Sequence, residues 1–395
     1  MRLVFQKTKS KLATIMICFD AGARAEGKEY NPGIAHMLEH MIFKGTEKRG
    51  YLDIPMEIAR IGGSTNAYTS MEQVVYYITA PVESLETTMD ILSDMVFHST
   101  FPEEEFLKER EVVTEECAAS EDQIDNFVHS KFFENYLTGR PAIPVIGTLE
   151  SIKEFSRDEL VRFYKQFYTL ENCIVAITAN KKKSEIEDLV SKYISKPDGK
   201  FKGLSVRKSK VKRKSQVTVS KENLQQSYVY MAFDVGELDK SKEAVYDILF
   251  EIFGSGMDSR LFTEVREKRG LCYSISAGTF RQRDANAVII SSDTRPEKIN
   301  QMVEVINTEV EKMKTELVTE EELVRAKNKW KSYNYAKMES SQSMLRDSMQ
   351  RTFFKFKSLK SIQETLDSVS AEDVLQAANE IFDFNKSQLF VCKSE

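Results

Sequence analysis

The sequence has few cysteines and histidines and no long apolar run. Its 395 residues include five cysteines and four histidines. No two cysteines form a CxxC pair, so we expect reduced thiols in a cytosolic protein, most of them small core residues. No stretch approaches the roughly 18 consecutive apolar residues that a membrane span requires. The composition therefore excludes a disulfide-stapled secreted domain and a membrane protein.

The chain also lacks a large excess of charge of one sign and a recognisable targeting segment. Its net charge of −5 argues against a general nucleic-acid binder, which usually carries a basic domain. Residues 1–7 contain neither an apolar h-region nor a small-residue cleavage site, so we expect a cytoplasmic protein. Hydrophobic residues make up 41% of the chain, enough for ordinary buried cores in two or three domains.

A boundary between two domains is predicted at residues 195–214. Pro197, Gly199 and Gly203 occur there among many lysines and arginines. This composition is typical of a solvated linker, although a basic surface for an acidic partner fits it too. We therefore expect an N-terminal domain at 1–194 and a C-terminal domain at 215–395.

The two sides of this linker repeat one pattern at an offset of 217 residues. In each half a strand is followed by a turn, a helix and a second, capped helix, so that Phe101 corresponds to Val318. Thr319 is expected to cap its helix, and Pro102 suits a first helical turn. A repeat of this length predicts a duplicated domain. At the position of the histidine-rich helix in the first half, the second half has no histidine.

Each half mixes amphipathic helices with segments that alternate like strands. Because strands and helices do not alternate regularly, the pattern predicts an α+β fold in which each domain has a mostly antiparallel sheet packed with helices. The clearest strand segments are residues 13–19, 73–78, 174–177 and 217–219.

Two of the four histidines lie on one predicted helix, residues 34–44, which follows a turn at Asn31-Pro32-Gly33. His36 and His40 are four residues apart, so they share one face of the helix and can bind one zinc ion. Glu39 lies between them, where a general base could take a proton from water. This HxxEH arrangement is the inverted form of the HExxH zinc motif. A surface helix with incidental histidines and a glutamate is the alternative interpretation.

A catalytic zinc ion needs a third protein ligand. A helix that begins near Pro102 carries Glu109 and Glu116 on one stripe, two turns apart, whereas Glu115 is rotated by about 100° from Glu116. We assign Glu116 as the ligand and Glu109 as a group that supports a ligand histidine. Glutamates are common on helices, so a solvated surface role is the competing interpretation for both.

Longer segments around these residues resemble the pitrilysin-type zinc metallopeptidases, in the branch of mitochondrial processing peptidase and its bacterial relatives. Residues 33–46 resemble the signature helix of that family, and residues 109–116 its third-ligand segment. Glu116 lies 76 residues after His40, as the family pattern requires. Residues 62–70 are similar to the active-site edge strand, which implies substrate binding at Asn66, Ala67 and Thr69. The family opens with a strand hairpin, which implies a short one here with residues 7–11 as its turn.

The second half adds a further resemblance. Residues 266–273 are similar to a family segment in which an arginine and a tyrosine lie seven residues apart, as Arg266 and Tyr273 do here. The resemblance implies that these two side chains contact the substrate carbonyl or its oxyanion. Taken alone, Arg266 fits a helix salt bridge and Tyr273 a half-buried strand residue.

The resemblance implies a zinc-dependent endopeptidase with one Zn²⁺ per chain and Glu39 as general base. Short members of the family dimerise into a clamshell chamber, so we expect a homodimer that hydrolyses peptides or unfolded polypeptides, with no nucleic acid or membrane involved. An obligate heterodimer is the alternative assembly. The alternative function is a non-catalytic scaffold or binding role, similar to the core subunits of respiratory complexes.

Overall fold

The structure, a computed structural model, describes residues 1–194, 201, 203–204 and 209–395. The described chain forms two compact units. Unit 1 comprises Met1–Phe127, Gly139–Arg207 and Lys337–Phe356, and unit 2 comprises Val128–Thr138, Lys208–Ala336 and Lys357–Glu395. Much of the predicted linker at 195–214 lies outside the described residues, and the domain limits 1–194 and 215–395 stay predictions.

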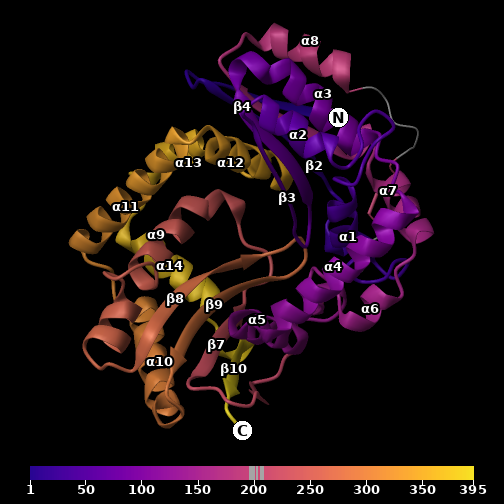
Figure 1. The fold of residues 1–395 in the computed structure, drawn as a ribbon. Helices are drawn as coiled ribbons and strands as arrows, with labels where there is room; N and C mark the ends of the chain where they lie inside the picture. Colours follow the sequence, from indigo (N-terminus) through magenta and orange to yellow (C-terminus); the bar gives the residue numbers. More distant parts are fainter. Residues whose placement is uncertain (195–200, 202, 205–208) are drawn as a thin grey trace. The chain divides into compact units, whose positions relative to one another are not determined.

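Unit 1 contains a five-stranded sheet in the order β1-β5-β2-β4-β3 (Figure 1). Only β1 and β5 pair in parallel, and the other neighbours are antiparallel. Strand β5 is buried along its whole length, because it lies inside the sheet with helices on both faces. The strands are β1 Arg2–Lys7, β2 Leu12–Phe19, β3 Ser64–Thr69, β4 Val74–Pro81 and β5 Cys173–Ala179.

Helices of the first half pack their apolar stripes on one face of this sheet and enclose the first hydrophobic core. Helix α3 also contacts β4 and β2 directly. The helices of this part of the chain are α1 Ile34–Met41, α2 Asp53–Arg60, α3 Leu85–Phe97, α4 Glu103–Asp122, α6 Leu149–Lys153, α7 Arg157–Phe167 and α8 Lys183–Tyr193.

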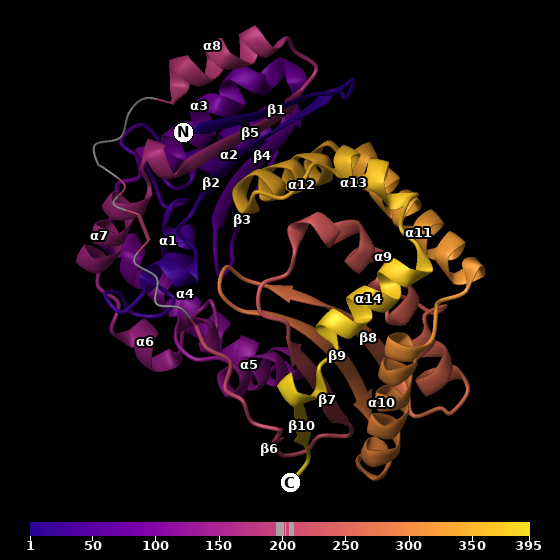
Figure 2. The ribbon, with the colours of Figure 1, turned by 180° about the vertical axis from the view of Figure 1, so that it is seen from behind.

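Unit 2 repeats this sheet strand for strand, in the order β6-β10-β7-β9-β8 (Figure 2). Again only its first pair, β6 with β10, is parallel. The strands are β6 Gln216–Ser220, β7 Ser227–Asp234, β8 Cys272–Arg281, β9 Asn286–Thr294 and β10 Ser387–Lys393. The helices are α9 Glu243–Phe253, α10 Ile299–Thr315, α11 Glu320–Glu339, α13 Leu359–Leu366 and α14 Ala371–Ile381. The equal topology confirms the predicted duplication and the α+β fold.

Each sheet also receives a helix from the other half of the sequence. Helix α12, Ser341–Phe354, packs on the sheet of unit 1, where Leu345 and Met349 join the core with Met16 of β2. Most of α5, Ile124–Tyr136, belongs to unit 2, where the ring of Phe132 contacts that of Tyr230 on β7. Helix α12 begins 217 residues after α5, so the two exchanged helices are equivalent members of the repeat.

Most local predictions agree with the structure, and two need correction. The four expected strands are present, and Thr319 caps its helix by accepting a hydrogen bond from the Glu322 amide at 3.2 Å. The predicted helix at 34–44 ends at Met41 and continues only as turns. The expected opening hairpin is absent, because β1 pairs with β5, which lies between β1 and β2.

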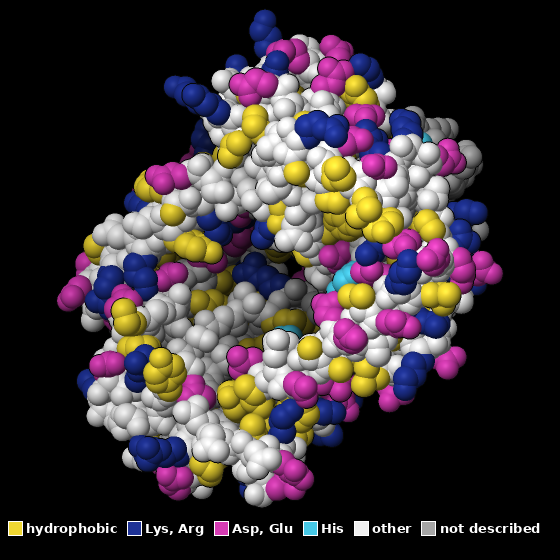
Figure 3. All heavy atoms as spheres, viewed as in Figure 1, with side chains coloured by type: hydrophobic (Ala, Val, Ile, Leu, Met, Phe, Trp, Pro, Cys, Tyr) yellow, Lys and Arg dark blue, Asp and Glu magenta, His cyan; other side chains and the backbone are white. Residues whose placement is uncertain are grey.

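The predicted exclusions can be compared with the described part of the chain. All five cysteines are free, and four of them are buried. Within residues 1–194 and 209–395, no helix combines the length and the apolar character needed to cross a bilayer. Acidic and basic side chains are interspersed over the face in Figure 3, with no wide area of one sign.

Candidate metal centre

Helix α1 begins at a position that only glycine can occupy. Gly33 has a φ of +99°, and a Cβ atom there would lie 2.2 Å from the Ile146 carbonyl oxygen. The buried carboxylate of Glu26 accepts hydrogen bonds from the backbone N–H groups of Gly33 (3.0 Å) and Ala35 (3.2 Å). Glu26 therefore satisfies amide donors at the start of the helix and complements its positive end. Arg140 pairs with the same carboxylate and fixes it.

The apolar residues of α1 leave one partly exposed face for its polar side chains. Ile34, Met37 and Leu38 are fully buried in the first core, whereas His36, Glu39 and His40 are half-buried. The imidazole rings of His36 and His40 lie 4.7 Å apart between centroids. Burial lowers the pKa of His36 to about 3, and the neighbouring His40 adds to the effect. His36 is therefore neutral, which is the form that binds a metal ion.

Glu116 of α4 reaches both histidines from the side. Its carboxylate oxygens lie 3.8 Å from His36 Nε2 and 3.4 Å from His40 Nε2. One ligand atom from each of these three residues lies within 4.8 Å of the others, and no further group of this kind occurs in the described ranges. Ligand atoms about 2.1 Å from one tetrahedral zinc ion are roughly 3.4 Å apart, so the three residues fit a zinc site.

Glu109 supports His40 from behind. Its Oε1 atom lies 2.8 Å from His40 Nδ1, and its other oxygen pairs with Lys44. Burial raises the pKa of Glu109, but the contacts with His40 and Lys44 outweigh it and hold the pKa below its usual value. Such a carboxylate fixes the imidazole tautomer, so that Nε2 is the atom offered to a metal. Lys44 was not among the predicted site residues, although its position four residues after His40 could have indicated it.

Replacing Glu109 with glutamine is expected to weaken zinc binding by roughly 10–100-fold, the usual cost of losing an outer-shell carboxylate. The amide would keep one acceptor for His40 but would lose the charge that also pairs with Lys44. Competition with a chromophoric chelator measures the affinity. Glu111→Gln, an exposed position on the same helix, is the matched control. Equal affinities of the two variants would contradict the supporting role.

Glu39 occupies the remaining position on this face of α1. Its Oε2 atom accepts a 2.5 Å hydrogen bond from the Thr69 hydroxyl of β3. Burial raises the pKa of Glu39, and the charge of Glu116 adds to this, although the Thr69 hydrogen bond and His40 oppose it. A carboxylate with a raised pKa beside a metal site is suited to moving a proton at neutral pH.

The three residues expected to bind substrate all lie on β3, the outer strand of the sheet in unit 1. Asn66 is exposed, and its side chain accepts a 2.8 Å hydrogen bond from the Ala67 amide. Ala67 packs against the first core. Thr69 faces Glu39, a hydrogen bond that the sequence analysis did not foresee.

Arg266 and Tyr273 belong to unit 2, where they lie close together. Arg266 is in a single π-helical turn, Phe262–Glu267, and Tyr273 is on β8. The guanidinium lies 5.2 Å from the centre of the Tyr273 ring and 4.6 Å from that of Phe262. Tyr273 is 73% exposed, so the structure does not support the alternative of a half-buried strand residue.

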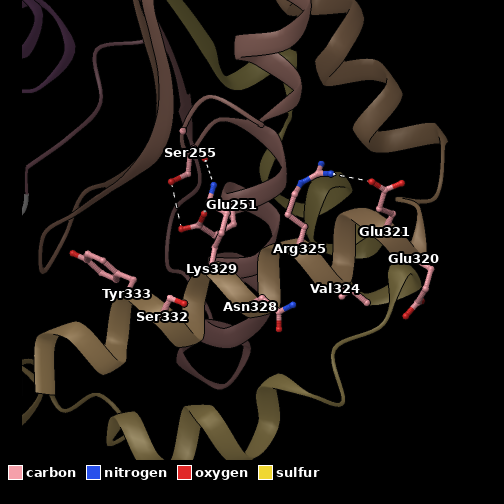
Figure 4. A pocket seen from close by; sticks show the side chains of 11 residues that line it. Glu251, Ser255, Glu320, Glu321, Val324, Arg325, Asn328, Lys329, Ser332 and Tyr333 are labelled. Atoms are coloured by element: carbon pink, nitrogen blue, oxygen red, sulfur yellow. Dashed lines mark hydrogen bonds and ion pairs between the residues drawn. The ribbon is translucent and has the colours of Figure 1, made fainter.

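A hollow of about 1070 Å³ also lies in unit 2, beside α9 and α11 (Figure 4). None of the predicted site residues lines it. Its charged groups satisfy one another: Lys329 lies 3.1 Å from Glu251 and donates at 2.8 Å to the Ser255 carbonyl. The hollow therefore offers no cluster of metal ligands.

Comparison with known proteins identifies the family. Residues 2–144 match the family described as "Insulinase (Peptidase family M16)", and residues 154–330 match the "Peptidase M16 inactive domain". The chain belongs to the M16 peptidase family. Among its M16 relatives, the "Uncharacterized zinc protease YmxG" of Bacillus subtilis is 31% identical over 387 residues, which cover 96% of this chain and 93% of the relative. An "Uncharacterized zinc protease" of Rickettsia bellii is 31% identical over 369 residues, which cover 91% of this chain and 88% of the relative.

Solved structures confirm the M16 fold. A protease from Helicobacter pylori aligns with a TM-score of 0.91 at 22% identity, over 99% of this chain and 96% of that one. A "peptidase M16 inactive domain" from Pseudomonas fluorescens gives 0.90 at 18% identity, over 100% and 95%. The label "inactive" also describes the matched segment at 154–330, which lies outside α1 and α4. At the level of the family, the relatives' names indicate a zinc protease.

Proposed function

We propose that this M16 chain is a zinc-dependent endopeptidase with one Zn²⁺ ion held by His36, His40 and Glu116. The observation that carries the proposal is the convergence of these three ligand atoms within 4.8 Å, with Glu39 on the same face of α1. Three protein ligands leave the open coordination position that a catalytic site needs. The relatives named zinc proteases support the same metal.

A zinc ion bound there would acidify water and polarise the substrate carbonyl. Glu39 takes the proton from the attacking water and passes it to the departing amine. The Thr69 hydroxyl holds Glu39 Oε2, so the carboxylate keeps one orientation and its other oxygen remains for the proton. Glu109 keeps the tautomer of His40 fixed throughout.

The substrate is an extended peptide that adds to β3. As the outer strand of its sheet, β3 presents one edge of main-chain N–H and C=O groups for pairing. Main-chain pairing supplies affinity without requiring a particular sequence, and it requires an unfolded segment. Peptides and unfolded polypeptides are therefore the proposed substrate class.

The active form is a cytoplasmic homodimer whose two chains enclose a chamber, with Arg266 and Tyr273 of one chain serving the metal site of the other. The close pairing of these two side chains and the exposure of Tyr273 support a role toward a ligand outside unit 2. A guanidinium and a phenol together can stabilise the oxyanion of a tetrahedral intermediate.

Mixing two inactive variants tests this assembly. Glu39→Gln and Tyr273→Phe are each expected to lose most activity alone. After subunit exchange, a mixed dimer contains one site with intact Glu39 and intact Tyr273, so activity should recover to roughly a quarter of the wild-type value. Absence of recovery, although the labelled subunits exchange, would contradict the shared site.

A quenched-peptide assay combined with elemental analysis tests the activity itself. Chain purified alone should contain about one zinc per chain and cleave an unstructured peptide, and a chelator should abolish cleavage reversibly. Zinc without hydrolysis of any peptide in a diverse library would instead favour the non-catalytic scaffold or binding role. Activity that appears only after a second, different chain is added would favour the heterodimer.

A further inference from the structure

Arg346 of α12 lies against two tyrosine rings on the second face of the sheet in unit 1. Its guanidinium carbon is 5.3 Å from the centre of the Tyr68 ring on β3 and 5.8 Å from that of Tyr77 on β4. All three side chains are half-buried. Cation–π contact with two rings holds the planar guanidinium in place and removes part of its hydration.

This cation has no anionic partner among the residues that the structure describes. The nearby Arg351, on the same helix, donates at 2.8 Å to Asp347. In contrast, Arg346 Nε and the Tyr68 hydroxyl are both buried and form no hydrogen bond with the described protein atoms. Buried donors are normally satisfied, and a guanidinium prefers a planar carboxylate. Two unsatisfied donors on neighbouring side chains are therefore suited to receive one carboxylate.

The position of Tyr68 connects these donors with the edge of β3. Side chains alternate along a strand, so Ser64, Asn66 and Tyr68 share one face, whereas Thr69 is on the opposite face, where it bonds Glu39. A peptide that pairs with β3 alternates in the same way. Every second peptide side chain then lies on the Tyr68 face, with the Cβ atom of a directly opposed residue about 4.5–5.5 Å from that of Tyr68.

We infer that Arg346, together with Tyr68, binds a carboxylate of the peptide that adds to β3 and thereby determines substrate specificity. The inference rests on the proposed peptidase function. The carboxylate comes from a glutamate or aspartate side chain or from the peptide C-terminus, since either gives the same planar anion. Recognition takes place on the sheet face opposite Glu39, so it selects the position of the peptide and takes no part in the proton transfer.

Peptide binding to a Glu39→Gln background tests the inference without cleavage. Fluorescein-labelled, unstructured peptides carry either glutamate or glutamine at one scanned position, each with a free or an amidated C-terminus. Fluorescence anisotropy gives the dissociation constants. We expect glutamate at one position to improve binding about tenfold over glutamine, the size of one charge-assisted hydrogen bond at a half-exposed site. Moving it to either adjacent position should remove the gain, because the side chain then points to the other face.

The glutamate-to-glutamine ratio separates specificity from a general structural role. Arg346→Met in the same background should bring the ratio close to one, whereas Arg351→Met, the control on the same helix, should retain it. Arg346→Glu should instead favour lysine at the same position, and it remains informative if the methionine variant folds poorly. A gain that depends only on the free C-terminus would identify the terminal carboxylate as the bound group.

Three results would overturn the inference. The first is equal binding of all acidic and neutral peptides, and the second is a glutamate preference that survives in Arg346→Met. In either case hydrolysis of the same peptides by the wild-type chain would leave the proposed function standing. The third is failure of every peptide to bind, together with failure of the wild-type chain to cleave any of them, which would remove the proposed function as well.

Discussion

Glu39→Gln is expected to lower kcat for peptide hydrolysis by about 10²–10⁴-fold, the usual contribution of a general acid–base group. Glutamine has nearly the same shape as glutamate and can still accept the hydrogen bond from Thr69. It cannot accept a proton from water at neutral pH, so the step assigned to Glu39 loses its base. Steady-state kinetics with a quenched peptide measure the loss.

Zinc content distinguishes this loss from damage to the site. The carboxylate of Glu39 is not one of the three converging ligands, so the variant should still bind zinc with near-wild-type affinity. Glu115→Gln, an exposed carboxylate next to Glu116, serves as the control for removing one acidic charge nearby, and it should retain activity. Hydrolysis at the wild-type rate by Glu39→Gln would remove Glu39 from the role of base.

The first-half site could be predicted from the sequence because its residues obey short-range rules. His36, Glu39 and His40 lie on one helix, where a spacing of four residues is enough to place two imidazoles on one face. The choice between Glu115 and Glu116 also followed from helix geometry, and the structure brings only Glu116 into the ligand cluster.

The supporting contacts could not be predicted because they join distant segments. Glu26 meets Arg140 across 114 positions of the sequence, and neither residue belongs to a local motif. Their pairing depends on how a loop before α1 packs against a loop after α5. The hydrogen bond between Thr69 and Glu39 depends likewise on the register of β3, which a single strand pattern does not determine.

The order of the sheet and the exchange of helices were beyond sequence patterns for a similar reason. Residues 2–7 and 12–19 alternate like two arms of a hairpin, yet β5 lies between them and pairs with both. The long chain separation of β5 is recovered through burial of its continuous apolar run. The 217-residue repeat predicted a duplicated fold, but it contained no information on which unit receives α5 and which receives α12.

Glu116→Ala is expected to weaken zinc binding by more than the roughly 100-fold upper range of outer-shell substitutions, because it removes one of three direct ligands. Activity at ordinary zinc concentrations should fall with the metal. Glu116 is about half exposed, with 48% of its side chain accessible, so its removal should change the stability of the metal-free chain by only about 0.5 kcal/mol or less. The variant should therefore fold normally while failing to bind zinc.

Thermal unfolding with and without zinc provides a readout that is independent of activity. A ligand that binds only the folded state raises Tm according to its concentration relative to Kd, so added zinc should raise Tm in the wild-type chain and in Glu115→Ala. The same addition should leave Tm of Glu116→Ala nearly unchanged. Because Glu115 and Glu116 are adjacent on α4 and both exposed, a difference between their variants reports the direction of one carboxylate toward His36 and His40. An equal zinc response in both variants would mean that the third ligand lies elsewhere, and the proposed metal site would then be wrong.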